Sequence, residues 1–304
     1  MFKLVCGAGN EDAESVKRLV YIYAKAGAEL FDISARKEIL DAAKEGQKLS
    51  NREDLNFCVS IGIKGDPHIK KAKICESNCI KCGNCIRVCP NDAVLSSIII
   101  DEKRCIGCSA CMKKCPAGAI RMVEKDVNYR EILPYMVKNG VDFLELHIMG
   151  HDKTDLDNKW RVINECAPKF ASICIDRENF GNREVLERIK NMIKDRKPYT
   201  TIIQADGIPM SGSDDSYKTT LQAVAMAEIV QNAELPVYIM ISGGTNSKTA
   251  ELAKMCGINY WGIAVGSWAR KIVKKYTSLP DFWENENVQK EAIQIAKELV
   301  RACE

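Results

Sequence analysis

Short apolar segments alternate with amphipathic segments along most of the chain. Eight segments rich in β-branched and aromatic residues predict strands, and helical spacing of apolar positions follows most of them. Residues 238–241 are apolar at every position, which is typical of a parallel strand buried on both faces. The predicted strands span residues 2–6, 29–33, 57–63, 142–147, 170–175, 199–204, 236–242 and 260–265. The predicted helices span residues 12–26, 36–48, 183–195, 216–232, 247–256, 267–276 and 286–302.

The alternation predicts a barrel with one inserted domain. Glycines such as Gly27 and Gly257 stand between a helix and the next strand, where a left-handed residue ends the helix. Without residues 69–125, which follow the third strand, 247 residues remain, close to the roughly 250 of a (β/α)8 TIM-type barrel. We therefore expect an α/β fold with a (β/α)8 barrel over residues 1–68 plus 126–304. A doubly wound open sheet is the alternative.

Composition excludes several classes of protein. The chain has 304 residues, 46% hydrophobic and 28% charged, so it is long enough to bury a large core. A run of about 18 apolar residues is absent, which argues against a membrane span. The N-terminus lacks the layout of a secretory signal, so we expect a cytoplasmic protein. The net charge of +3 is too small to indicate a nucleic-acid partner.

The cysteines are unusual in number and position. Nine of the fifteen fall between Cys75 and Cys115. Eight of these form two copies of Cys-x2-Cys-x2-Cys-x3-Cys-Pro, namely Cys79, Cys82, Cys85 and Cys89, then Cys105, Cys108, Cys111 and Cys115. Clustered Cys-x-x-Cys spacing favours metal ligation in a reducing compartment over disulfides. Zinc is the alternative metal. A zinc site needs four ligands per ion, but it does not need an eight-cysteine repeat in which a proline follows each run.

The repeat resembles the cysteine runs of bacterial two-cluster ferredoxins. In that motif three cysteines hold one cluster and the fourth ligates the other. The resemblance implies two [4Fe-4S] clusters and a ferredoxin-like α+β insertion over residues 69–125. Its ligand sets would be Cys79, Cys82, Cys85 and Cys115 for the first cluster, and Cys89, Cys105, Cys108 and Cys111 for the second. Because loops after barrel strands lie at the C-terminal face, we expect the clusters over the barrel mouth.

Glycines after the last two predicted strands indicate an anion site. Gly243 and Gly244 follow the seventh strand, and Gly266 and Ser267 follow the eighth. Glycines allow backbone N–H groups to approach a phosphate, and the helix that follows adds its positive end. The phosphate of a small-molecule substrate or of a flavin mononucleotide (FMN) would fit here. The alternative is that these glycines only make tight turns.

Two of the three histidines and one aspartate are candidates for proton transfer. His68, His147 and Asp206 stand at or near predicted strand ends, where barrel enzymes place their chemistry. The alternative for each histidine is a hydrogen bond to the backbone without a catalytic role. Asp206 also begins a Gly- and Pro-containing loop over residues 206–212, which we interpret as a lid or a substrate wall.

The chain also resembles the cyanobacterial light-dependent period protein family. The resemblance lies in the cysteine insertion and in residues 3–10, 65–68, 206–212, 243–246 and 266–271. It implies an iron–sulfur protein, described in that family as sensing cellular redox state for the circadian clock.

Two functions follow as hypotheses. The first is an oxidoreductase that relays electrons through two clusters to a flavin or substrate at the barrel mouth. The second is a non-enzymatic redox sensor or electron-transfer subunit that acts through a protein partner. A redox partner protein is expected in both cases. A flavin in the mouth would favour the first hypothesis, and an empty mouth with a stable partner complex would favour the second.

Overall fold

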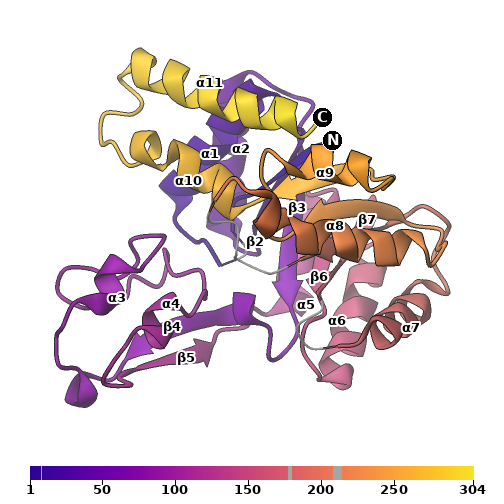
Figure 1. The fold of residues 1–304 in the computed structure, drawn as a ribbon, viewed down its shortest axis with the longest axis horizontal. Helices are drawn as coiled ribbons and strands as arrows, with labels where there is room; N and C mark the ends of the chain where they lie inside the picture. The colour runs from indigo at the N-terminus through magenta and orange to yellow at the C-terminus, as the bar shows by residue number, and fades with distance from the viewer. Residues whose placement is uncertain (8, 177–179, 208–213) are drawn as a thin grey trace.

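Eight parallel strands close into a barrel. The computed structural model describes residues 1–7, 9–176, 180–207 and 214–304. Around the barrel the strands follow the order β1-β10-β9-β8-β7-β6-β3-β2. Figure 1 shows the fold of the chain. The predicted barrel is therefore confirmed, and the open sheet is not what the chain forms. Its strands are β1 (Phe2–Val5), β2 (Leu30–Ser34), β3 (Asn56–Gly62), β6 (Phe143–His147), β7 (Phe170–Ile175), β8 (Thr201–Asp206), β9 (Tyr238–Ser242) and β10 (Gly262–Val265).

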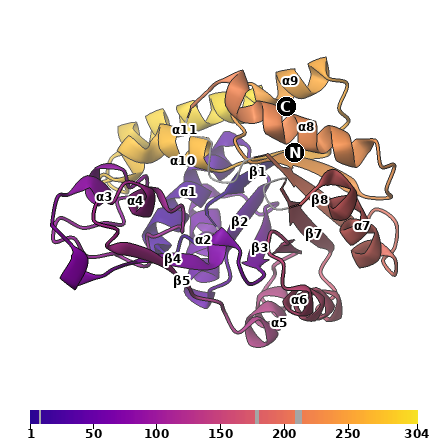
Figure 2. The same cartoon turned by 60° about the horizontal axis from the view of Figure 1, so that its bottom comes forward.

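Helices surround the strands, as Figure 2 shows. Two of them, α5 and α6, were not among the predicted helices. Pro134 interrupts the helical signal of α5, and α6 has a mainly polar sequence with few apolar positions. The helices are α1 (Ala13–Ala26), α2 (Lys37–Ser50), α5 (Tyr129–Lys138), α6 (Lys153–Glu165), α7 (Asn182–Ile193), α8 (Tyr217–Gln231), α9 (Thr249–Met255), α10 (Ser267–Thr277) and α11 (Glu286–Ala302).

The barrel interior is apolar only toward the end where the strands begin. There Phe143, Phe170, Tyr238 and Trp261 pack with ring centroids 5.1 to 6.3 Å apart. In an eight-stranded barrel, alternate side chains point inward and fill the interior. These four rings therefore fill the barrel at that end. The next inward-facing positions carry polar side chains, including Lys3. In the described part of the chain, the polar positions of the barrel interior therefore lie toward its C-terminal end.

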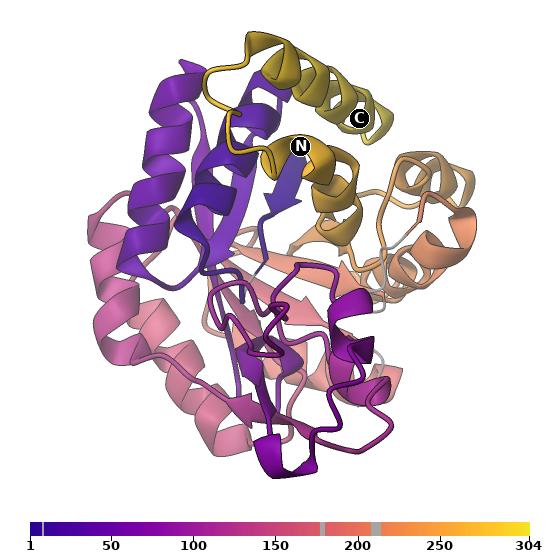
Figure 3. The ribbon, with the colours of Figure 1, turned by 90° about the vertical axis from the view of Figure 1, so that its left-hand side faces the viewer.

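The insertion between β3 and β6 is a small domain with its own hydrophobic core. Strand β4 (Lys70–Ile74) pairs antiparallel with β5 (Ile120–Glu124) and brackets the cysteine runs. Two one-turn helices, α3 (Asn84–Arg87) and α4 (Ala110–Lys113), lie between these strands. The core joins one face of the hairpin to the cysteines. Figure 3 shows the insertion in front of the barrel, and Figure 1 shows it on the side away from α7.

A buried lysine joins the insertion to the barrel. Lys71 on β4 donates hydrogen bonds to the carbonyl oxygens of Gly9, at 2.6 Å, and Cys105, at 2.8 Å. Its ammonium also lies 3.4 Å from the carboxylate of Glu11. Burial lowers the pKa of Lys71, while the charge of Glu11 opposes that shift. One side chain thereby ties the loop after β1 to the second cysteine run.

Gly107 allows the second cysteine run to pass in contact with the start of β4. Its φ is +77°, in the left-handed region. A Cβ atom at this position would lie 2.6 Å from the carbonyl oxygen of Lys70 and would also meet that of Pro67. Both oxygens belong to the backbone, so they cannot rotate away as a side chain could. Residue 107 must therefore be glycine for this packing.

We expect Gly107→Ala to destabilise the insertion by about 1–3 kcal/mol more than Gly118→Ala does, because only the first methyl group is forced against backbone. Gly118 is a matched control, since its φ is +58° and no described atom lies within 4 Å of an added Cβ. Both variants carry the left-handed penalty of roughly 1–2 kcal/mol. Denaturant unfolding of the two variants measures the difference, and equal losses would contradict this role for Gly107.

Candidate functional site

The cysteines of the two runs line two cavities in the insertion. The first cavity is lined by Cys79, Cys82, Cys85 and Cys115. The second is lined by Cys89, Cys105, Cys108 and Cys111. Each cavity thus draws three cysteines from one run and the fourth from the other. The remaining cysteine of this region, Cys75, is exposed, with its Sγ 3.2 Å from the hydroxyl of Ser77.

Left-handed residues at equivalent places bend both runs around their cavities. The second residue after the first cysteine is Lys81 in one run, with φ +56°, and Gly107 in the other. The fourth residue after that cysteine is Gly83 in one run, with φ +72°, and Ser109 in the other, with φ +60°. Left-handed residues reverse the chain locally. Three thiols can therefore face one cavity within seven residues.

The surroundings of these thiols suit iron–sulfur ligands. Backbone N–H groups donate to the sulfurs of Cys89, at 3.2 Å, and of Cys105 and Cys115, both at 3.3 Å. Burial, followed by the charge of neighbouring Cys108, raises the pKa of Cys111 to about 11. Free thiols packed this way resist ionisation, so a cationic core has to stabilise the thiolates. Hydrogen bonds to sulfur are a normal feature of cluster sites.

A pocket opens at the barrel mouth, between the ends of the barrel strands and the insertion. The structure brings most of the predicted site residues together on its wall. These are His147, Asp206, Gly243, Gly244, Gly266 and Ser267. His68 lies in the 3₁₀ turn Pro67–Ile69, and its side chain is outside the described residues. Most of the predicted lid over residues 206–212 also lies outside them.

One residue of the insertion belongs to both the mouth pocket and the second cysteine cavity. Ile106 lines the pocket together with His147 and Asp206, and it lines the second cavity together with Cys105 and Cys108. Its side chain is buried. The second cavity and the mouth pocket are therefore neighbours that share one apolar wall.

Directly below the pocket lies a buried ionic cluster that sequence analysis did not find. The ammonium of Lys3 on β1 lies 2.8 Å from the carboxylate of Glu145 on β6 and 3.2 Å from that of Asp32 on β2. All three side chains are almost fully buried. A signal for this cluster is present in the sequence. Lys3 stands within the otherwise apolar strand Phe2–Val5, and Glu145 stands within the strand Phe143–His147.

Glu145 is the centre of this cluster. Besides Lys3, it accepts hydrogen bonds from Ser172 at 2.7 Å, Gln204 at 3.0 Å and Ser60 at 3.3 Å. Burial alone would raise the pKa of Glu145. The charge of Lys3 and the hydrogen bond with His147 outweigh it, so the pKa is held well below its usual range. Glu145 is therefore an ionised carboxylate inside the barrel.

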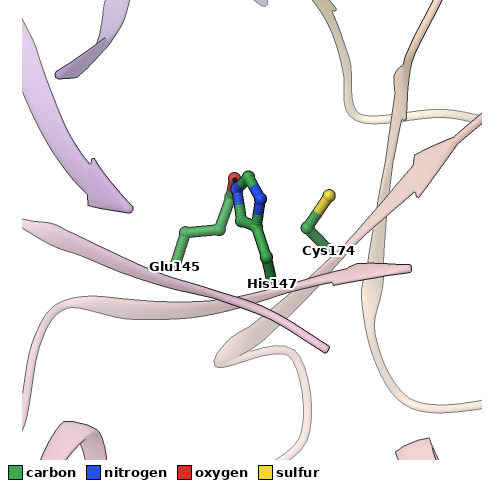
Figure 4. A group of neighbouring side chains, drawn as sticks. All are labelled: Glu145, His147 and Cys174. Carbon is green, nitrogen blue, oxygen red and sulfur yellow. Dashed lines mark hydrogen bonds and ion pairs between the residues drawn. The ribbon is translucent and has the colours of Figure 1, made fainter. Parts of the chain in front are cut away.

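His147 links the ionic cluster to the pocket. Its Nε2 lies 3.1 Å from Glu145, and its Nδ1 lies 3.6 Å from the carboxylate of Asp66. Burial lowers the pKa of His147, but the hydrogen bond with Glu145 and the charge of Asp66 outweigh it and raise the pKa to about 9. Figure 4 shows the side chains of Glu145, His147 and Cys174 on neighbouring strands. His147 is therefore an imidazolium at neutral pH.

The same three side chains have the composition of a transition-metal site. Ligand atoms of Glu145, His147 and Cys174 all lie within 4.8 Å of one another. Lys3 already provides a cation against Glu145, and His147 would have to lose its proton to bind a metal. Burial also raises the pKa of Cys174 well above its usual value. The group is therefore better suited to holding a proton than a metal ion.

The other side of the pocket has the features of an anion site. Gly266 precedes α10 without a side-chain cap. Arg270 donates from Nη1 to the carbonyl oxygen of Val5 at 2.7 Å, and its buried Nε has no hydrogen-bond partner among the described residues. Gly243 has another reason to be glycine, because an added Cβ would meet the carboxylate of Asp206. An anion therefore fits best near Gly266 and Arg270, away from Asp206.

Comparison with known proteins adds three findings. Residues 135–302 match the family model described as the light dependent period A C-terminal domain. Residues 76–95 and 98–121 match the 4Fe-4S binding domain. The chain is 29% identical over 321 residues to "Light dependent period A" from Synechococcus elongatus, covering 99% of this chain and 87% of that protein.

Solved structures with a similar fold include two barrel enzymes. The α subunit of tryptophan synthase from Legionella pneumophila is 11% identical with a TM-score of 0.48, covering 99% of this chain and 92% of that one. Type I 3-dehydroquinate dehydratase from Clostridium difficile is 10% identical with a TM-score of 0.46, and the match covers 96% of this chain and 92% of that one. Among the described residues, no helix combines the length and the apolar composition needed to cross a bilayer.

The raised pKa of His147 predicts a pH-dependent stability. Its folded-state pKa of about 9 exceeds the unfolded value near 6.5, so its contribution is complete below about pH 6.5 and is lost as pH rises through 9. We expect about 3 kcal/mol to be lost from this group in that window. His147→Gln should remove most of this slope in denaturant unfolding at pH 6 and 9.5, whereas the exposed His151→Gln should keep it. A wild-type slope in His147→Gln would contradict the assignment.

Proposed function

This chain belongs to the light dependent period A family and has iron–sulfur, electron-transfer character, and from that premise we propose that it is an oxidoreductase. Two [4Fe-4S] clusters in the insertion would relay electrons to a small molecule in the barrel mouth. A thiol-rich chain of this kind suits the reducing interior of the cell. The proposal depends most on one observation, which is that Ile106 is a shared wall of the second cysteine cavity and the mouth pocket.

The two cysteine cavities supply the ligand sets of the proposal. Cys79, Cys82, Cys85 and Cys115 would hold the first cluster, and Cys89, Cys105, Cys108 and Cys111 the second. A [4Fe-4S] cluster accepts and releases one electron at a time. Among the described residues, the second cavity shares a lining residue with the pocket and the first cavity does not, so electrons would leave the insertion on the side of Ile106.

His147 would supply a proton to the reduced substrate. A two-electron reduction of an organic group consumes two protons, and His147 holds one at neutral pH on the pocket wall. After it gives up that proton, neutral His147 still bonds to Glu145. The open pocket lets solvent supply the second proton. Asp206 lines the same pocket and is the second candidate for this role.

An anionic group would orient the substrate. Gly244, Gly266 and Ser267 line the pocket on the side of Arg270, whose guanidinium remains charged although burial lowers its pKa. The helix α10 has eleven residues and starts at Ser267, so its dipole adds positive potential there. A phosphate, including that of FMN, has the chemistry that this side would bind.

A redox sensor or electron-transfer subunit that acts through a protein partner is the second candidate. The observation that favours it is a group of exposed apolar side chains on the insertion, among them Ile80 and Ile99. Such side chains mark protein contacts when they gather on one surface. A sensor or electron-transfer subunit would need no substrate in the mouth pocket.

Anaerobic purification tests the proposal directly. We expect about eight irons and eight acid-labile sulfides per chain, with visible absorbance that falls on addition of dithionite. Reoxidation of the reduced protein is then followed with FMN and with phosphate-bearing carbonyl and alkene compounds. An iron-loaded chain that binds none of these and is reoxidised by none would overturn the oxidoreductase proposal and leave the sensor role.

The ligand assignment predicts a contrast between two cysteines. Cys82→Ser should lose about half of the iron and lower the melting temperature, because the insertion's fold is linked to its metal. Cys75→Ser is the matched control, since Cys75 is exposed and lies outside both cavities. Its iron content should equal that of the wild type. Full iron in Cys82→Ser, or equal losses in both variants, would refute the assignment.

The anion site predicts a contrast on α10. Arg270→Met should weaken binding of inorganic phosphate or FMN by about tenfold or more, since a charge-assisted hydrogen bond is worth roughly 1.5–3 kcal/mol. Lys275→Met removes a cation from the exposed side of the same helix and should leave binding unchanged. Equilibrium dialysis measures both. Equal affinity of the two variants for phosphate or FMN would contradict the anion site. The glycines after β9 and β10 would then serve only to form turns.

A further inference from the structure

The two ends of the insertion differ in how they are covered. The end with the second cavity is held against the barrel by Lys71 and by two ion pairs, Arg104 with Asp12 at 3.1 Å and Lys274 with Asp92 at 2.7 Å. Comparable contacts with the barrel are not found around the first cavity in the described part of the chain. Cys82, which lines that cavity, is exposed.

Apolar side chains gather at the uncovered end. Ile80 is 66% exposed, Ile99 59% and Leu95 40%. Ile80, which stands between Cys79 and Cys82 in the chain, lines the first cavity, and Ile98 lines it too. The backbone N–H of Leu95 donates to the carbonyl oxygen of Ile99 at 2.9 Å, so these two residues flank Ile98 on one turn. We call Ile80, Leu95 and Ile99, with the cations described next, the outer face.

Four exposed cations stand within two residues of cysteines that line the first cavity, and we count them with the outer face. Lys81 and Lys114 directly precede Cys82 and Cys115, while Arg87 and Lys113 end the two short helices. None of the four forms an ion pair with another described residue. Across residues 76–90 and 110–118 the only acidic residue in the sequence is Glu76. Positive side chains therefore outnumber negative ones in the two segments that carry these cations.

We propose that the outer face docks an acidic electron-carrier protein that reduces the chain through the first cavity. The proposal rests on the function proposed above. One electron passes from the reduced carrier to the chain, so the carrier is oxidised by one electron and no bond or proton is exchanged. An apolar centre with a charged rim suits a transient complex, in which charge speeds association. A second copy of this chain is disfavoured, because it would bring the same four cations.

Charge reversal on the outer face tests the proposal. Lys81→Glu/Lys114→Glu should slow reduction of the oxidised chain by a reduced acidic flavodoxin at least about tenfold at low salt, and the difference should shrink at high salt. The matched control, Lys44→Glu/Lys218→Glu, makes the same change of net charge on exposed positions of α2 and α8. Reduction by dithionite, which needs no docking surface, should be the same in all three proteins.

Equilibrium binding separates this inference from the proposed function. Affinity for oxidised flavodoxin, measured by calorimetry, should fall in Lys81→Glu/Lys114→Glu and not in the control, whether or not any substrate is turned over. Equal carrier rates and equal affinities in the two variants would overturn the docking site. Two other results would also overturn it. One is that the wild type dimerises with increasing concentration and only the outer-face variant does not. The other is that the wild type sediments with anionic lipid vesicles and only the outer-face variant does not. Failure to turn over any substrate, with the carrier results intact, would count against the proposed function alone.

Discussion

The contact between Lys3 and Glu145 is the constraint on which the rest of the barrel depends. A buried carboxylate or ammonium alone would cost several kcal/mol, so each requires the other together with a complete set of hydrogen bonds. That requirement explains why the inward positions of neighbouring strands carry Ser172 and Gln204 where barrels of this type usually carry branched apolar residues. A stability argument alone would favour an apolar layer here. The charged layer therefore indicates that the barrel interior serves the pocket above it.

The ionic layer acts on the pocket through His147. Glu145 is held ionised by Lys3, and its negative charge in turn keeps a proton on the imidazole. Asp66 comes from the segment that leads into the insertion, so the same proton also depends on how the insertion joins the barrel. The electrostatics of the mouth and the attachment of the insertion are thus coupled through one side chain. The shared wall at Ile106 is a second connection between the same two parts.

Sequence patterns predicted the barrel and the iron–sulfur character well because both depend on local periodicity and spacing. The strand segments are apolar at consecutive positions, and the cysteine repeat has no other common use with both prolines. The helix α6 escaped prediction because its buried face includes Lys159, whose ammonium bonds to the carbonyl oxygen of Gly62. Lys3 and Glu145 escaped for a related reason. They are 142 residues apart in the chain, and a lone charge in a short strand gives no sign of its partner.

Charge also connects the two ends of the proposed electron path. Each electron delivered to the insertion adds one negative charge near the barrel mouth. Among the described residues, His147 and Arg270 are the cations that line the mouth pocket, so they would stabilise that charge and the proposed anionic substrate at the same place. In the proposed reaction, proton transfer from His147 would remove one of these cations as the substrate takes up its electrons. The mouth would then bind an anion less strongly, which would favour release of a reduced, still anionic product from the same pocket.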